Sequence, residues 1–311
     1  MNSSFEYLSE KQVATFHEEG FLLIPDFLTD EQVAQYKKGC QMRLLGDTAC
    51  HEIFDHITLS EEMGKIMRDL MGTQEVLYPG LSFSRTNDFP NRFGSRSFHT
   101  DAAFEPGNFN EFYPILNTGF YLQDYRKHSG GLKLIPKSHR RECITIRTVF
   151  EGIKKALSFL VRGNFTQARN TFDFSPSVNI ENSPRDLIIW STRTHHAGYA
   201  VRLKLFPKIS IHPVFENWIP TFLTKPTPPE RDVILTIYGA PGEIFEKYLA
   251  IQVRKAHRKD FFLASTLGTP ALQKIATRAG ITIRDDGHVY ASDPQSTFSK
   301  RTEKRYPSGA Q

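Results

Sequence analysis

The sequence is poor in cysteine and has no long apolar run. Its 311 residues include three cysteines, Cys40, Cys50 and Cys143. Their scattered spacing excludes a CxxC zinc finger and a disulfide scaffold, and it indicates a reducing compartment. No apolar stretch reaches the roughly 18 residues that a membrane-spanning helix needs, and the first residues lack the basic and apolar parts of a secretory signal. We therefore expect a soluble, cytoplasmic protein.

The sequence also lacks the composition of a disordered chain, because 39% of its residues are hydrophobic and 23% are charged. Its length predicts one large domain or two ordinary ones. The net charge is +5, and the region 226–311 holds 13 Lys/Arg against 9 Asp/Glu. The densest basic stretch, 254–259, is either a solvated helix face or a surface for phosphate, an acidic partner or a membrane. No nucleic-acid-binding motif accompanies it, so we do not expect nucleic-acid binding.

The hydrophobic pattern changes along the chain. Capping signals and helical periodicity predict helices at 9–19, 29–36 and 60–72. From about residue 75, short β-rich runs separated by Gly, Pro and Asn predict an antiparallel sandwich or barrel. The expected strands are 76–78, 81–84, 97–101, 117–123, 132–135, 187–190 and 209–215. A basic helical segment at 148–170 interrupts these strands. We expect a β-core with N-terminal helices over 1–225 and a basic, mostly helical extension over 226–311.

A first candidate for chemistry is the pair His99 and Asp101. Side chains two residues apart in a strand leave the same face, so the imidazole and the carboxylate point together. With one more histidine they would form the two-histidine, one-carboxylate triad that holds Fe(II) and leaves positions open for other ligands. A salt-bridged aspartate at a strand end is the competing interpretation of this pair.

The further histidine is expected on a later strand. His195 and His196 follow the buried-looking strand 187–190. Adjacent residues cannot both face inward on a strand, so only one of the two is a ligand candidate. His212, on the expected strand 209–215, is the competing candidate.

Four motifs, in their order along the chain, resemble those of the phytanoyl-CoA dioxygenase family of Fe(II)/2-oxoglutarate oxygenases. They are FHEEGFLLIPDFLTDEQ at 16–32, FHTD at 98–101, TGFYLQD at 118–124 followed by SGGLKLIPKSH at 129–139, and RTHHAG at 193–198. The resemblance spans about residues 5–216. It implies a mainly β fold with flanking helices: a double-stranded β-helix (jelly-roll, cupin-like) core with a helical insertion and a helical C-terminal extension. It also implies that His99, Asp101 and His196 bind Fe(II).

The sequence departs from the family in two places. Lys137 replaces the usual glycine of the PGSH turn, and Pro207 stands where the family places an arginine that grips the far carboxylate of 2-oxoglutarate. Lys208, which opens the expected strand 209–215, is favoured for this role by position, and Arg202 by the bidentate chemistry of its guanidinium. Arg85 or Arg96 would be next. Thr118 is a candidate for a hydroxyl contact with the cosubstrate.

The resemblance implies a dioxygenase that uses 2-oxoglutarate and O2, hydroxylates an unactivated C–H bond of a small molecule, and releases succinate and CO2. Asp101 favours hydroxylation over halogenation, because halogenating relatives carry a small residue there. Desaturation, epimerisation and ring formation stay open. The alternatives are a jelly-roll isomerase or hydrolase with another metal, and a non-catalytic protein that binds through its basic C-terminal surface.

The basic residues of 148–170 and of the C-terminal region bear on the substrate. They suggest a carboxylate, phosphate or thioester conjugate, that is, an anionic substrate at an entrance shaped by both segments. Packing helices with solvated outer faces are an equally good interpretation. The residues concerned are Lys154, Lys155, Arg162, Arg169, Arg254, Lys255, Arg258 and Lys259.

Overall fold

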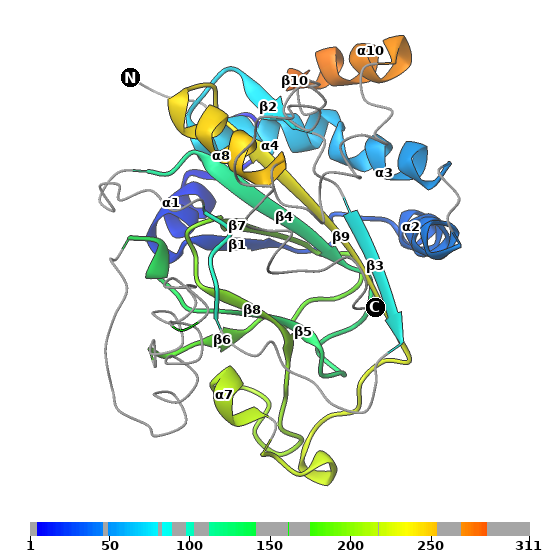
Figure 1. Ribbon diagram of the computed structural model, residues 1–311, viewed down its shortest axis with the longest axis vertical. Helices are drawn as coiled ribbons and strands as arrows, with labels where there is room; N and C mark the ends of the chain where they lie inside the picture. Colours follow the sequence, from blue (N-terminus) through cyan, green and yellow to red (C-terminus); the bar gives the residue numbers. More distant parts are fainter. Residues whose placement is uncertain are drawn as a thin grey trace.

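Two β-sheets and a group of helices make up the computed structural model (Figure 1). The structure describes residues 5–45, 49–79, 83–88, 98–102, 112–140, 161, 175–216, 218–253 and 269–284. Within these ranges, no helix combines the length and the apolar character that crossing a membrane requires. Cys40 and Cys50 are buried.

The N-terminal helices follow the capping signals. Helix α1 (Glu10–Glu19) begins after Ser9 and helix α2 (Asp30–Leu44) after Thr29, each with a capping box that satisfies the first backbone N–H groups. Helix α3 (Cys50–Thr58) precedes helix α4 (Glu61–Met71), which ends at Gly72 in the left-handed conformation. The helices predicted at 9–19, 29–36 and 60–72 are confirmed, and the second extends to Leu44. Their apolar faces pack on one side of the larger sheet.

The larger sheet has seven strands, in the order β1-β7-β4-β9-β2-β10, with β3 paired to β9. All pairs are antiparallel except β2 with β10. The strands are β1 (Phe21–Ile24), β2 (Val76–Tyr78), β3 (Phe83–Asp88), β4 (Ile115–Tyr121), β7 (Leu187–Ser191), β9 (Glu230–Gly239) and β10 (Ile281–Ile283). Strand β4 therefore lies at the centre, between β7 and β9.

The smaller sheet has the order β6-β5-β8, formed by β6 (Val178–Asn179), β5 (Gly131–Leu134) and β8 (His196–Ala200). Leu132 and Leu134 of β5 pack against Tyr121, Ile188 and Val233 of the larger sheet. This apolar layer joins the inner faces of the two sheets. The helices cover the other face of the larger sheet, where Leu116, Phe120 and Ile189 are buried.

Three expectations about individual elements are wrong. Residues 98–101 of the expected strand 97–101 form only an isolated bridge, at His99. The region after residue 226 begins with β9, a ten-residue strand inside the larger sheet, and only then continues with helices α8 (Glu243–Val253) and α10 (Pro270–Ala279). Because both faces of β9 are covered, its sequence lacks the alternation that marks a half-exposed strand. The expected strand 209–215 is an irregular segment that leads into the short helix α7 (Pro213–Glu216).

Several other expectations fall on parts of the chain that the structure does not describe. The helical insertion at 148–170 lies outside the described residues except for Val161, and the basic stretch 254–259 lies outside them entirely. The division of the chain at residue 225 stays a prediction.

Candidate metal centre

His99, Asp101 and His196 converge at one point. Each offers a ligand atom, and these atoms all lie within 4.8 Å of one another. The backbone places them: the N–H groups of His99 and His196 donate to each other's carbonyl oxygens at 3.0 and 2.9 Å, and the N–H of Asp101 donates to the Thr192 carbonyl at 2.9 Å. Of the competing histidines, His195 donates its backbone N–H to Ser138, and His212 packs its ring on Phe98 at 5.3 Å. The triad includes His196.

The imidazole of His196 is buried and held at both nitrogens. Nδ1 lies 3.0 Å from the Thr194 carbonyl oxygen, which requires Nδ1 to carry a proton, and Nε2 lies 3.3 Å from Asp101 Oδ2. Burial lowers the pKa of His196, but the Asp101 carboxylate and the Thr194 carbonyl outweigh it, and the net pKa is raised. With Nδ1 fixed as the proton donor to Thr194, Nε2 is the nitrogen that can bind a metal beside the carboxylate.

Two buried amides position Asp101. The Nδ2 of Asn117, on β4, donates to Asp101 Oδ2 at 2.8 Å, and the Nε2 of Gln252, on α8, donates to the Asp101 carbonyl at 3.3 Å. Neither residue was predicted from the sequence. An asparagine inside a buried, apolar strand is the signal that could have found Asn117, because a buried amide needs partners.

Thr118 does not join the triad. Its register partners are Ile189 and Thr236, and its hydroxyl lies 3.4 Å from the Thr236 carbonyl, on the face that the helices cover. Neighbouring residues in a strand point to opposite faces, so the side chain that reaches the centre from β4 is that of Asn117.

The two cations that the sequence favoured are also placed elsewhere. Arg202 is buried and donates to the Tyr125 carbonyl oxygen and to the Glu181 carboxylate. Lys208 is exposed. The side chain of Arg85 and all of Arg96 lie outside what the structure describes.

Arg231, near the start of β9, is a cation that the sequence analysis missed. It is buried, its Nε donates to the Gly130 carbonyl at 3.2 Å, and its guanidinium lies 5.2 Å from the ring centre of Tyr121. One of its terminal nitrogens would lie 3.6 Å from a Cβ at Gly198, which is two residues beyond His196 on β8. About thirty residues separate His196 from β9. The family's short spacing between its distal histidine and its arginine therefore could not identify Arg231.

The triad and the two sheets define a class: a sheet-dominated protein with a site of two histidines and one carboxylate. The family model described as phytanoyl-CoA dioxygenase (PhyH) matches residues 41–202. The chain belongs to the phytanoyl-CoA dioxygenase family. This confirms the resemblance found in the sequence.

Individual relatives are more distant. An ectoine dioxygenase of Bordetella bronchiseptica is 26% identical over 160 residues, covering 43% of this chain and 50% of the relative. The chain thus spans about half the length of the curated relatives it matches. Among solved structures, the non-haem α-ketoglutarate-dependent carbocyclase SnoK from nogalamycin biosynthesis has a TM-score of 0.50 at 16% identity, covering 76% of this chain and 86% of that one. EctD from S. alaskensis, solved with 2-oxoglutarate and 5-hydroxyectoine, has a TM-score of 0.47 at 17% identity, with 77% and 78% covered. The SnoK likeness supports the fold.

Proposed function

We propose that this protein is an Fe(II)/2-oxoglutarate-dependent dioxygenase built on a double-stranded β-helix. The convergence of His99, Asp101 and His196 carries the proposal. Two imidazoles and one carboxylate on one side of an ion are the donor set of non-haem Fe(II) oxygenases. The 3.3 Å between His196 Nε2 and Asp101 Oδ2 brings two of the three donor atoms close enough to bind the same ion.

Bound at this site, Fe(II) with 2-oxoglutarate and O2 would supply the oxidation of an unactivated C–H bond, with release of succinate and CO2. The chain's own residues prepare the site. Thr194 fixes the proton on His196 Nδ1, and Asn117 fixes one oxygen of Asp101. Because these partners are buried, the ligands keep their orientation before a metal arrives. The carboxylate of Asp101 favours hydroxylation over halogenation.

For the far carboxylate of 2-oxoglutarate we favour Arg231 over Lys208 and Arg202. A carboxylate buried between the sheets needs a cation, and arginine can bind it through two hydrogen bonds. Arg231 lies on the inner face of β9, since the register that pairs Tyr121 with Val233 puts residues 231 and 233 on the same face as Tyr121 and Asn117. Gly198 lacks a side chain where the guanidinium approaches β8.

The substrate is a small molecule in this proposal. An anionic substrate remains our expectation from the basic segments, which the structure does not describe. The first experiment is anaerobic addition of Fe(II) and 2-oxoglutarate to the purified chain. We expect a visible metal-to-ligand charge-transfer band and, in air, slow succinate formation. An isomerase, a hydrolase or a non-catalytic binding protein would give neither.

The same assay tests the cosubstrate contact. Arg231→Gln should raise the 2-oxoglutarate concentration that gives half-maximal absorbance by about a hundredfold, because a buried carboxylate would lose its cation. Lys208→Gln is the matched control and should change it little. A strong effect of Lys208→Gln or Arg202→Gln, with none at Arg231→Gln, would return the role to the candidates that the sequence favoured.

A further inference from the structure

Residues 203–225, the middle of the connection between β8 and β9, gather exposed apolar side chains. Among the described residues, eleven large apolar side chains are exposed, and six of them lie in this stretch. Trp218 is 63%, Phe222 71% and Leu205 79% exposed. The full set is Leu205, Phe206, Ile209, Trp218, Phe222 and Leu223. Single exposed apolar residues are ordinary, but a cluster on a connecting segment marks an interaction surface.

The segment is held at its base like a hairpin. Leu203 and Thr224 form an antiparallel bridge, and the N–H of Lys204 donates to the Leu223 carbonyl at 2.9 Å. Leu205 and Phe206 therefore lie beside Phe222 and Leu223. In Figure 1 the segment, with α7, forms the end of the molecule opposite the helices α4 and α10. We call residues 203–225 the apolar lobe.

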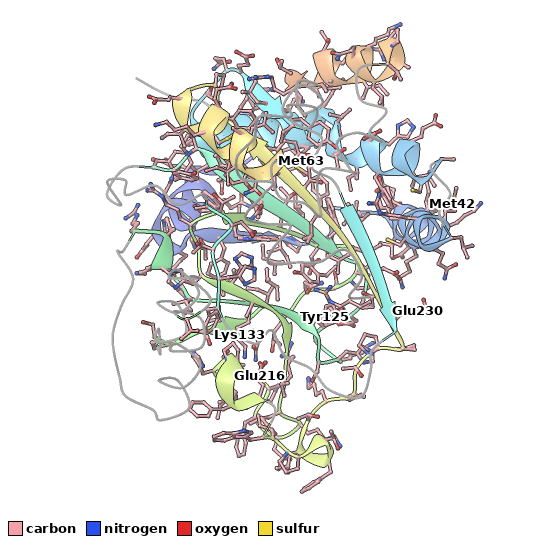
Figure 2. The ribbon with its side chains drawn as sticks, viewed as in Figure 1. Met42, Met63, Tyr125, Lys133, Glu216 and Glu230 are labelled. Atoms are coloured by element: carbon pink, nitrogen blue, oxygen red, sulfur yellow. The ribbon has the colours of Figure 1, made fainter. Side chains whose placement is uncertain are left out.

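A buried ion pair fixes the apolar lobe on the smaller sheet. Lys133 Nζ, on β5, lies 2.5 Å from Glu216 Oε1 on α7 and also donates to the Ile211 carbonyl, and the N–H of Val201 donates to Glu216 at 3.0 Å. Figure 2 shows Lys133 and Glu216 meeting between the sheet and α7. The lobe thus has a preformed shape, and its outer apolar side chains are exposed despite this anchoring.

The outer surface of the lobe carries charge of one sign. Glu216 is its one acidic residue in the sequence, and this carboxylate is buried against Lys133. Lys204 and Lys208 are exposed, and Lys225 is half-buried. Aromatic and aliphatic side chains interleaved with lysines match the boundary of an anionic bilayer, where rings sit among the headgroups and lysines meet lipid phosphates.

We propose that the apolar lobe is a docking surface for an anionic lipid membrane. Its aromatic side chains enter the headgroup region while Lys204 and Lys208 contact the phosphates. A second copy of the chain is the less favourable occupant, because a two-fold contact between identical lobes would bring lysines against lysines. The proposal is independent of the oxygenase function.

The experiment uses the full chain and large unilamellar vesicles of phosphatidylcholine, with or without phosphatidylserine. Co-sedimentation measures partitioning, and tryptophan emission reports where the lobe lies. The chain has two tryptophans, and Trp190 is buried. A blue shift on adding phosphatidylserine vesicles would therefore arise from Trp218. We expect this shift, and we expect Trp218→Phe to abolish it while the protein still binds.

Paired variants separate the two parts of the surface. Lys204→Glu/Lys208→Glu should weaken partitioning by more than about tenfold, since each lysine near an anionic surface contributes about a fivefold effect. Trp218→Ser/Phe222→Ser should weaken it by about tenfold or more. The matched controls Lys38→Glu/Lys274→Glu and Leu45→Ser change exposed residues elsewhere and should leave partitioning unchanged. Circular dichroism confirms that each variant is folded.

Several results would overturn the proposal. These are no binding to phosphatidylserine vesicles, equal binding to neutral vesicles, or equal losses in the control variants. Free protein in which acrylamide fails to quench Trp218 would show that the chain itself covers the lobe. A dimer in sedimentation equilibrium that Trp218→Ser/Phe222→Ser dissociates, with no vesicle binding, would assign the surface to a contact between copies.

Discussion

Each face of the smaller sheet has a carboxylate beside a nitrogen base, but only the carboxylate on the outer face is deeply buried. Leu134 pairs with His196 and Lys133 with Ala197, so His196 faces the larger sheet and Lys133 faces the apolar lobe. On the inner face, ligand atoms of His99, Asp101 and His196 converge in an arrangement that can hold a metal ion. On the outer face the lysine is itself the cation. Buried charge alone therefore does not mark a site; converging acceptors do.

Solvent access separates the two groups further. The Asp101 side chain is 28% exposed and that of Glu216 is 1% exposed. On the outer face, burial lowers the pKa of Lys133 and raises the pKa of Glu216, and their mutual attraction offsets only part of this. An ion pair so deeply buried contributes more to the placement of α7 than to net stability.

The largest effect is expected for the triad on the inner face, in its iron affinity and turnover. His196→Ala or Asp101→Ala should lower iron affinity and succinate formation by more than about a hundredfold, because even residues that merely support a ligand are worth 10–100-fold. The unfolding midpoint should stay near that of the wild type. Iron content by mass spectrometry and a coupled turnover assay check this. Full activity in His196→Ala would contradict the triad.

Substitutions in the Lys133–Glu216 pair on the outer face should change the free energy of unfolding. Lys133→Met leaves the Glu216 carboxylate buried without its cation and should lower the free energy of unfolding by about 3–5 kcal/mol. The double variant Lys133→Met/Glu216→Leu should recover most of this loss, because neither charge remains. Urea unfolding of the two single variants and the double variant measures the coupling. A double variant as unstable as the sum of the single ones would show that the pair is not coupled.

Asn117 and Thr118 compare the two faces of a single strand. Asn117→Ala should weaken iron binding by about 10–100-fold, since the Asp101 carboxylate loses its hydrogen-bond donor. Thr118→Ser, one residue away on the helix-covered face, should leave iron binding unchanged. Titration of both variants with Fe(II) measures and compares their iron affinities. Equal effects at the two positions would show that this asymmetry does not govern the metal.

The smallest effect concerns a carboxyl buried beside another acid. Burial, and then the negative charge of Glu52, raise the pKa of Asp55 to about 7. The folded state thus favours the protonated form, and stability falls as the pH rises from about 4, the unfolded pKa, toward 7. Asp55→Asn should remove this slope and raise the free energy of unfolding above pH 7. Urea midpoints below and above that pH measure it. An unchanged slope would place the titration elsewhere.

Local signals in the sequence identified His99, Asp101 and many of the elements, whereas the choice of His196 over His195 and His212 came from the family resemblance. Capping boxes marked α1 and α2, and the spacing of His99 and Asp101 marked the centre. Contacts between residues far apart in the sequence could not be predicted from local patterns. Lys133 and Glu216 are 83 positions apart, and nothing local marks them as partners. Thr118 was a candidate and Asn117 was not, because the phase of β4 relative to the two sheets is a tertiary property.

The late position of β9 in the chain has a consequence for folding. Strand β4 pairs with β9 from Ile115–Gly239 to Tyr121–Val233, and β3 pairs with the same strand. During synthesis, β3 and β4 leave the ribosome long before their shared neighbour, so their unpaired edges stay open until residue 239 has emerged. Pairings this distant make closure of the sheet slow, and the open edges are the part of the nascent chain most exposed to aggregation.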